Sequence, residues 1–213
     1  MTTKIKICGL TTPDTLDAAL DAGADFVGFV MVKASPRYAG PALAKRLVDR
    51  ARGRAKTVLL FADMVGPEMD DLVHDLRPDM IQLHGRETPL QVRNARADWE
   101  IPVIKAVGVA GAEDLVGLEA MEASADHLLL DAKAPKGAFY SGGHGLAFDW
   151  TLLADRAFRH PWFLAGGLNP DNVAEALRIT AAPMVDVSSG VESAPGVKDA
   201  DRIATFIQNA RRS

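Results

Sequence analysis

The chain has 213 residues, of which 48% are hydrophobic and 24% charged, and these proportions exclude disordered and fibrous proteins. Its 24 lysines and arginines against 28 aspartates and glutamates give a net charge of −4, which indicates neither a nucleic-acid nor an anionic-membrane partner. The longest apolar stretch, residues 26–32, is too short to span a bilayer, and no basic segment followed by an apolar one opens the chain. We therefore expect a single cytoplasmic domain over residues 1–213.

Short runs of β-branched and apolar residues alternate along the chain with longer segments of helical periodicity. The runs predict strands at residues 4–8, 26–30, 57–61, 80–83, 103–106, 127–130, 163–165 and 184–187. The segments between them predict helices at residues 13–21, 41–51, 68–75, 89–97, 112–121, 170–178 and 199–211, with a glycine-rich loop at 138–145 and a weaker helix at 150–156. Strands that each precede a helix are typical of a closed parallel (β/α)₈ barrel, the TIM barrel, with a doubly wound open sheet as the alternative.

The ends of the last two predicted strands favour a phosphate site. Gly166 and Gly167 follow the seventh strand, and Ser188, Ser189 and Gly190 follow the eighth. Small residues let backbone N–H groups turn toward an anion, and barrels that bind phosphate use these two loops at the carboxyl face where their active sites lie. Glycine and serine are common in turns, so either loop alone would indicate only a turn. Both loops together favour a small phosphorylated substrate.

Cys8, the only cysteine in the chain, ends the first strand. A lone cysteine fits a reducing compartment, and its usual role is that of a small buried hydrophobe. Here Lys4, Lys6 and Cys8 alternate onto one face of the strand, and two inward lysines would be unusual in a passive core. We hypothesise that Lys6, paired with a carboxylate, favours the thiolate of Cys8. Asp186 in the eighth strand is either that partner or a further carboxylate of the site.

Three more polar side chains follow predicted strands. Asp131 comes after a nearly all-apolar strand, so its carboxyl group is expected at the barrel mouth as a protonated general acid, with a capping role as the alternative. Arg37, in the loop after the second strand, can bind a planar carboxylate, although a surface arginine is usually solvated. His84 after the fourth strand is equally a polar lining residue or a histidine with satisfied hydrogen bonds. The five histidines lack zinc-like spacing, so no metal site is expected.

Together these segments resemble the phosphoribosylanthranilate isomerase family of tryptophan biosynthesis, over nearly the whole chain. The segments that carry the resemblance are KICGL at 6–10, GFV at 28–30, SPR at 35–37, QLHG at 82–85, LD at 130–131, residues 142–150, LAGGL at 164–168, DVSSGVE at 186–192 and GVKD at 196–199. The chain departs from the pattern at His144, where the glycine-rich loop usually has a small hydroxyl residue, and at 60–62.

The resemblance implies an isomerase that needs no cofactor. The reaction would be the Amadori rearrangement of N-(5-phosphoribosyl)anthranilate to 1-(2-carboxyphenylamino)-1-deoxyribulose 5-phosphate. Asp131 would be the general acid that opens the ribose ring, and Cys8 the general base that removes the C2′ proton. Arg37 would bind the anthranilate carboxylate, and the loops after strands seven and eight would bind the phosphate.

Two other classes of function stay open at this point. Another phosphate-binding barrel enzyme is one: an epimerase would need metal-binding histidines that the chain does not supply, and an indole-glycerol-phosphate synthase would need a catalytic glutamate to accompany Lys105. The other is a non-catalytic sugar-phosphate-binding barrel, which would not need Cys8 opposite Asp131. The barrel is compatible with a monomer or a homodimer, and the loop at 132–145 is a candidate lid.

Overall fold

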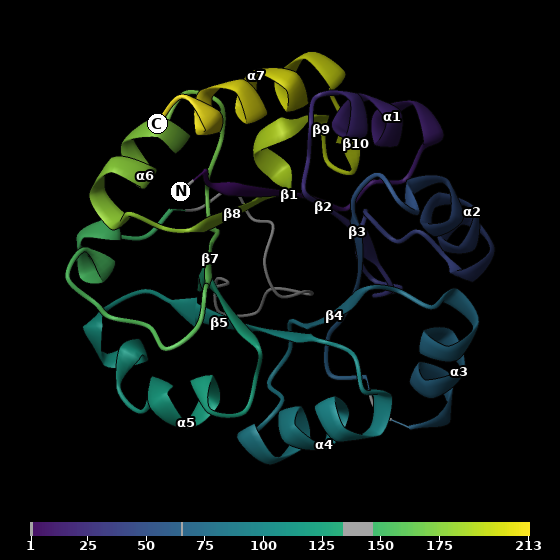
Figure 1. Ribbon diagram of the computed structural model, residues 1–213, viewed down its shortest axis with the longest axis horizontal. Helices are drawn as coiled ribbons and strands as arrows, with labels where there is room; N and C mark the ends of the chain where they lie inside the picture. Colours follow the sequence, from purple (N-terminus) through teal and green to yellow (C-terminus); the bar gives the residue numbers. More distant parts are fainter. Residues whose placement is uncertain (1, 65, 134–146) are drawn as a thin grey trace.

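The computed structural model describes residues 2–64, 66–133 and 147–213. Eight parallel strands form a closed barrel in chain order, and β8 pairs back onto β1 (Figure 1). The strands are β1 (Lys4–Cys8), β2 (Phe26–Val30), β3 (Lys56–Phe61), β4 (Met80–Leu83), β5 (Val103–Val109), β6 (His127–Ala132), β7 (Phe163–Leu164) and β8 (Met184–Val187). The predicted (β/α)₈ barrel is therefore confirmed, and the open sheet is excluded.

Helices surround the ring of strands on its outer side (Figure 1). They are α1 (Pro13–Asp21), α2 (Pro41–Ala51), α3 (Pro67–Leu76), α4 (Pro89–Trp99), α5 (Leu118–Glu122), α6 (Val173–Thr180) and α7 (Ala200–Arg211), with short 3₁₀ helices η1 (Ala112–Leu115), η2 (Trp150–Leu153) and η3 (Ser189–Val191). Proline opens α1 to α4, where its missing N–H is not needed. No helix among the described ranges is long and apolar enough to cross a membrane.

Three predicted helices differ from the observed ones in kind or starting point, and those at 68–75, 89–97 and 199–211 differ by only one or two residues at their ends. The segment at 112–121 divides into η1 and α5 because Gly117 adopts a positive φ of 76° between them. The helix predicted from residue 170 begins at Val173, because the Asn169 side chain accepts the N–H groups of Asp171 and Asn172 and holds residues 170–172 in a turn. The weak helix at 150–156 is the 3₁₀ helix η2.

A two-stranded hairpin after β8 was not predicted. It consists of β9 (Glu192–Ala194) and β10 (Val197–Lys198), and it lies beside the start of the barrel near α1 (Figure 1). Strands of two or three residues are too short to show a period of two in the sequence. The hairpin nevertheless positions two charged side chains of the site.

The interior of the barrel is apolar at one level and contains both polar and apolar side chains nearer the carboxyl ends of the strands. The apolar cluster consists of Val58, Met80, Ile104, Ala106, Leu129, Phe163, Ala165 and Met184, with Phe26 packed against it. The Phe26 and Phe163 rings pack edge to face, with their centroids 5.3 Å apart. Two residues further along the strands, the register sets Lys6 beside Asp186 and Leu60 beside Gln82. Polar side chains thus stand among the apolar ones near the carboxyl ends of the strands, where barrel active sites lie.

Candidate active site

Cys8 ends β1 with its thiol inside the barrel. Its exposure is 3%, and Gly28 of β2 is its partner in the strand register. A Cβ at Gly28 would lie 2.9 Å from Cys8 Sγ and 3.3 Å from Lys6 Cε. The space that the thiol occupies therefore depends on the missing side chain of this glycine.

Lys6 lies within hydrogen-bond reach of two neighbours and is fully buried. Its Nζ donates to Asp186 Oδ1 and to Gln82 Oε1, each at 2.8 Å. Asp186 is therefore the predicted carboxylate partner of Lys6. The expectation of two inward lysines is wrong for Lys4, whose exposed side chain pairs with Asp25 where the strand begins. Burial works to lower the pKa of Lys6, but Asp186 and Cys8 raise it above its usual value, so the ammonium stays charged.

Opposing interactions act on the pKa of the Cys8 thiol. Burial raises the pKa of Cys8 above its ordinary value, and this effect outweighs the others. Lys6 acts in the opposite direction, by charge and by a hydrogen bond, and Lys198 also lowers the pKa of the thiol. Lys6 thus acts on the thiol in the direction that the hypothesis assigns to it, while burial outweighs this effect and raises the pKa of Cys8.

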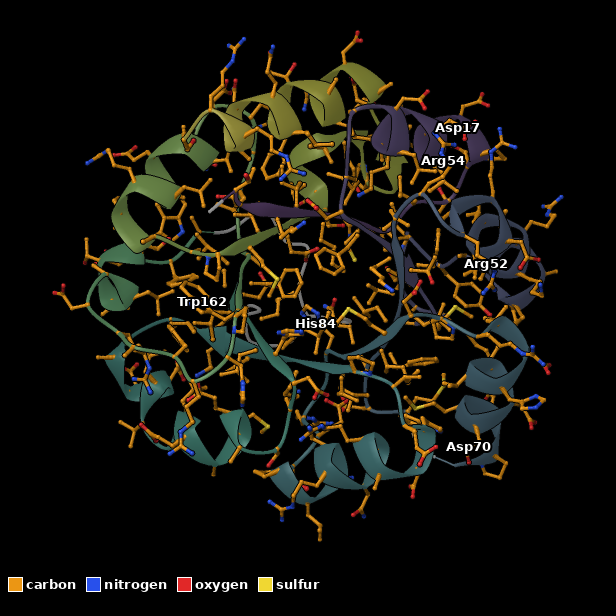
Figure 2. The ribbon with its side chains drawn as sticks, viewed as in Figure 1. Asp17, Arg52, Arg54, Asp70, His84 and Trp162 are labelled. Atoms are coloured by element: carbon orange, nitrogen blue, oxygen red, sulfur yellow. The ribbon has the colours of Figure 1, made fainter. Side chains whose placement is uncertain are left out.

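Asp131 and His84 lie together at the barrel mouth, and Figure 2 shows His84 inside the ring of strands. His84 Nε2 is 3.1 Å from Asp131 Oδ2, and Gln82 Nε2 is 2.7 Å from His84 Nδ1. The backbone N–H of Ala132 donates to Asp131 Oδ1 at 2.8 Å. His84 therefore lines the mouth and has partners on both ring nitrogens, so both of its sequence-based interpretations are correct.

Arg37 is a buried side chain, not a solvated surface residue. Only 5% of it is exposed, and its Nε and Nη2 donate to the two carboxylate oxygens of Glu192 at 2.7 and 2.8 Å. Lys198 Nζ donates to Glu192 Oε1 at 2.7 Å. Burial works to raise the pKa of Glu192, but Arg37 and Lys198 hold it below its usual value. Burial lowers the pKa of Lys198 despite Glu192.

Sequence reasoning missed Glu192 and Lys198 as members of the site. Both stand in segments that carried the resemblance, at the end of DVSSGVE and in GVKD. Their charge beside a predicted strand end was the available signal. What was lacking was the hairpin, which turns Lys198 back so that its Nζ reaches the Ser188 carbonyl at 2.9 Å.

The loops after β7 and β8 contact each other, as the phosphate prediction requires. Gly166 and Gly167 have positive φ angles of 82° and 65°, conformations that favour glycine. A Cβ at Gly190 would lie 1.9 Å from the Leu168 carbonyl oxygen, so only glycine fits at this approach. Ser188 Oγ donates to the Cys8 carbonyl at 3.1 Å, which ties the last loop to the end of β1.

Several residues singled out from the sequence lie outside this group. Lys105 is buried, but its Nζ donates to Gly85 O at 2.7 Å and to Glu87 Oε2 at 2.8 Å, so it holds the loop after β4. His144 and residues 134–145 of the candidate lid at 132–145 lie outside the described residues. Within the described ranges, no three histidine, cysteine, aspartate or glutamate side chains gather as a metal site.

The family model for N-(5'phosphoribosyl)anthranilate (PRA) isomerase matches residues 5–209. The chain belongs to this family. This PRA isomerase family member is 51% identical over 213 residues to the N-(5'-phosphoribosyl)anthranilate isomerase of Rhodopseudomonas palustris strain HaA2, a match that covers 100% of this chain and 98% of that relative. It is 49% identical over 211 residues to the isomerase of Paramagnetospirillum magneticum, with 99% and 98% covered.

Crystal structures of other PRA isomerase family members share the fold. The phosphoribosylanthranilate isomerase of Thermotoga maritima superposes with a TM-score of 0.89 at 36% identity, over 99% of this chain and 100% of that one. A second structure holds reduced 1-(o-carboxyphenylamino)-1-deoxyribulose 5-phosphate and superposes with a TM-score of 0.85 at 34% identity, over 99% and 100%. The resemblance read from the sequence segments is thus confirmed.

Proposed function

We propose that this protein is an enzyme of tryptophan biosynthesis that converts N-(5'-phosphoribosyl)anthranilate into 1-(2-carboxyphenylamino)-1-deoxyribulose 5-phosphate. The observation that carries the proposal is a buried thiol and a carboxyl group at one barrel mouth, where Cys8 neighbours Lys6 and Asp131 contacts His84. Membership of the PRA isomerase family supports it. We assign the reaction to a single barrel domain over residues 1–213.

The charged ends of this substrate match two parts of the mouth. We assign the phosphate to Gly166, Gly167, Ser188, Ser189 and Gly190, since backbone N–H groups in glycine loops bind anions. The loops after strands seven and eight are the usual phosphate site of such barrels. We assign the anthranilate carboxylate to Arg37, whose guanidinium Glu192 holds in a fixed orientation.

The first step opens the ribose ring. Asp131 gives its proton to the ring oxygen as the bond from C1′ to that oxygen breaks. The lone pair on the anthranilate nitrogen forms a C=N bond to C1′, so the product of the step is an iminium ion. Asp131 is left as a carboxylate.

The second step moves a hydrogen away from C2′. The Cys8 thiolate takes the C2′ proton, the C–H electron pair forms a C1′=C2′ bond, and the iminium electron pair returns to nitrogen. The enolamine then becomes the ketone as its 2′-hydroxyl loses a proton and C1′ gains one. Because the substrate nitrogen accepts the electron pair, the reaction needs no cofactor for this purpose.

Cys8 has to lose its proton before it can act as a base. Lys6 and Lys198 both favour the thiolate, and burial opposes it. We infer that the bound substrate meets a thiolate stabilised by these two ammonium groups. Asp186 keeps Lys6 charged and in place, since their atoms are 2.8 Å apart.

We propose the cytoplasm as the compartment, because a catalytic thiol needs reducing surroundings. The partner is the small phosphorylated substrate, and we propose neither a nucleic-acid nor a membrane partner. Either a monomer or a homodimer is compatible with the barrel, and a dimeric phosphoribosylanthranilate isomerase is known from Thermotoga maritima.

Fluorescence tests the proposed function directly. Phosphoribosylanthranilate generated in place should lose its anthranilate emission when the protein is added, and the product should be 1-(2-carboxyphenylamino)-1-deoxyribulose 5-phosphate by mass spectrometry and chromatography. Unchanged emission with a substrate preparation that a related isomerase consumes would contradict the proposal. It would favour a sugar-phosphate-binding protein on the same fold.

A further inference from the structure

A chain of hydrogen bonds crosses the barrel from β1 to β6. It starts at Lys6 Nζ, which is fully buried and 2.8 Å from Gln82 Oε1. An ammonium group has only donors, so the Gln82 amide must present its oxygen to Lys6. The Gln82 Nε2 group is thereby directed to the other side, where His84 lies.

This orientation fixes the hydrogen on the His84 ring. Gln82 Nε2 is 2.7 Å from His84 Nδ1, and an amide nitrogen is a donor only. His84 Nδ1 must therefore accept, which leaves it without a proton. The imidazole is then neutral, and its one hydrogen is on Nε2.

The Nε2–H group points to the carboxyl group of Asp131. The distance to Oδ2 is 3.1 Å, and the two side chains are 10% and 11% exposed. Ala132 donates to Oδ1 from the backbone, so both carboxyl oxygens are fixed by donors. Each oxygen has a second lone pair, so the group can still carry its acid proton.

We propose that Lys6 and Gln82 set the tautomer of His84, and that His84 in this tautomer positions Asp131 for proton donation. All three act through Asp131 and are positioning residues. The proposal rests on the general-acid role of Asp131 in the proposed function. The hydrogen on His84 Nε2, however, follows from the contacts alone.

The tautomer matters because the opposite one would compete with the substrate. A His84 ring with its hydrogen on Nδ1 would present a basic nitrogen to Asp131 and accept the acid proton. With the hydrogen on Nε2, His84 cannot take that proton, and the ring oxygen of the substrate is left as its acceptor. By fixing this tautomer, the Gln82 amide prevents transfer of the Asp131 proton to His84.

Nuclear magnetic resonance of protein labelled with ¹⁵N-histidine tests the tautomer. Long-range ¹H–¹⁵N correlations distinguish a ring protonated on Nε2 from one protonated on Nδ1, and His84→Gln identifies the signals among the five histidines. We expect wild-type His84 as the neutral Nε2–H form at neutral pH. In Gln82→Glu, whose carboxylate can accept from both Lys6 and His84, we expect a proton on Nδ1. A wild-type Nδ1–H ring or imidazolium would overturn the proposal.

Turnover tests the positioning through a matched pair. A glutamine side chain can place an amide N–H near the position of Nε2, whereas asparagine reaches only that of Nδ1. We expect His84→Gln to keep kcat within about tenfold and His84→Asn to lose about 100-fold, since a small misplacement of a catalytic group costs about that much. The exposed His74→Gln serves as control. The dissociation constant for reduced 1-(o-carboxyphenylamino)-1-deoxyribulose 5-phosphate should not change.

Equal losses in the glutamine and asparagine variants would overturn the positioning role. Failure of the proposed function has a different signature. If Asp131→Asn turned over like the wild type while His84 still carried its hydrogen on Nε2, the acid assignment would be wrong and the hydrogen-bond chain would stand. Should Gln82→Glu not fold, the wild-type spectrum and the His84 pair decide the outcome.

Discussion

At the scale of single residues, the buried Lys6 influences several groups of the candidate site. It pairs with Asp186 and Gln82 and also lowers the pKa of the Cys8 thiol. We propose that this one ammonium group acts on the proposed general base Cys8 through its charge and on the proposed general acid Asp131 through Gln82. Its position in β1, two residues from Cys8, makes both effects possible.

Replacement of Lys6 by methionine should raise the pKa of Cys8 further. The variant loses a charge and a hydrogen bond that favour the thiolate, and it leaves Asp186 to disfavour it. The rate of alkylation by iodoacetamide as a function of pH measures this pKa. Lys4→Met is the matched control, since Lys4 shares the strand but is exposed and pairs with Asp25.

The pH dependence of turnover should follow the same sign. A base must be deprotonated to act, and the pKa of Cys8 is raised. We therefore expect kcat/KM of the wild type to increase as pH rises from neutral toward the pKa of Cys8. In Lys6→Met this rise should occur at higher pH. If the Cys8 thiol of Lys6→Met has the same pKa as in the wild type, Lys6 does not influence the ionisation of Cys8.

At the scale of elements, the β9–β10 hairpin holds a buried charge cluster in which Glu192 accepts from Arg37 and Lys198. Glu192→Leu would leave two buried cations without their carboxylate. We expect the free energy of unfolding to fall by about 3–5 kcal/mol, the usual cost of breaking a buried pair. Glu175→Leu removes an exposed pair with Arg178 and should cost about 0–1 kcal/mol.

Urea unfolding at several pH values extends this comparison. Because the pKa of Glu192 is lowered in the folded protein, its contribution is fully present above its ordinary value of 4.5 and is lost as pH falls through the lowered value. The difference in the free energy of unfolding between the wild type and Glu192→Leu should therefore become smaller at acidic pH. A gap that is small at pH 7, or constant with pH, would show that the cluster does not stabilise the hairpin.

Elements with strong local signals were predictable from the sequence. Strands β1 and β2 and helices α1 and α2 have their predicted boundaries, since proline opens both helices, β1 alternates lysine with isoleucine and β2 is an apolar run. Prediction failed at α5 and α6, where Gly117 and Asn169 set the backbone locally. The hairpin was missed because its few residues carry no period.

The site was predictable where strand ends define it. Cys8 is the last residue of β1 and Asp131 lies near the end of β6, one residue further inside a strand than predicted, and the barrel topology brings such ends to one face. The partner of Arg37 was not predictable, because Glu192 is 155 residues away along the chain and contacts it through an unpredicted hairpin. His84 illustrates the same limit, since its two partners come from different strands.

At the scale of the whole molecule, closure of the barrel brings the proposed acid and the proposed base to one mouth. Cys8 belongs to β1 and Asp131 to β6, and pairing of β8 with β1 completes the ring that contains both. Glycines at the ends of β7 and in the loop after β8 complete the same face. We therefore propose that Cys8 and Asp131 perform the chemistry and that the surrounding loops bind the substrate.

The most direct test compares turnover with binding in Cys8→Ala and Asp131→Asn, with the exposed Asp49→Asn as control. Each site variant should lose about 10²- to 10⁴-fold in kcat, the usual contribution of one acid or base group. Its dissociation constant for reduced 1-(o-carboxyphenylamino)-1-deoxyribulose 5-phosphate should match that of the wild type. Near-wild-type turnover in either variant would contradict the role assigned to that residue.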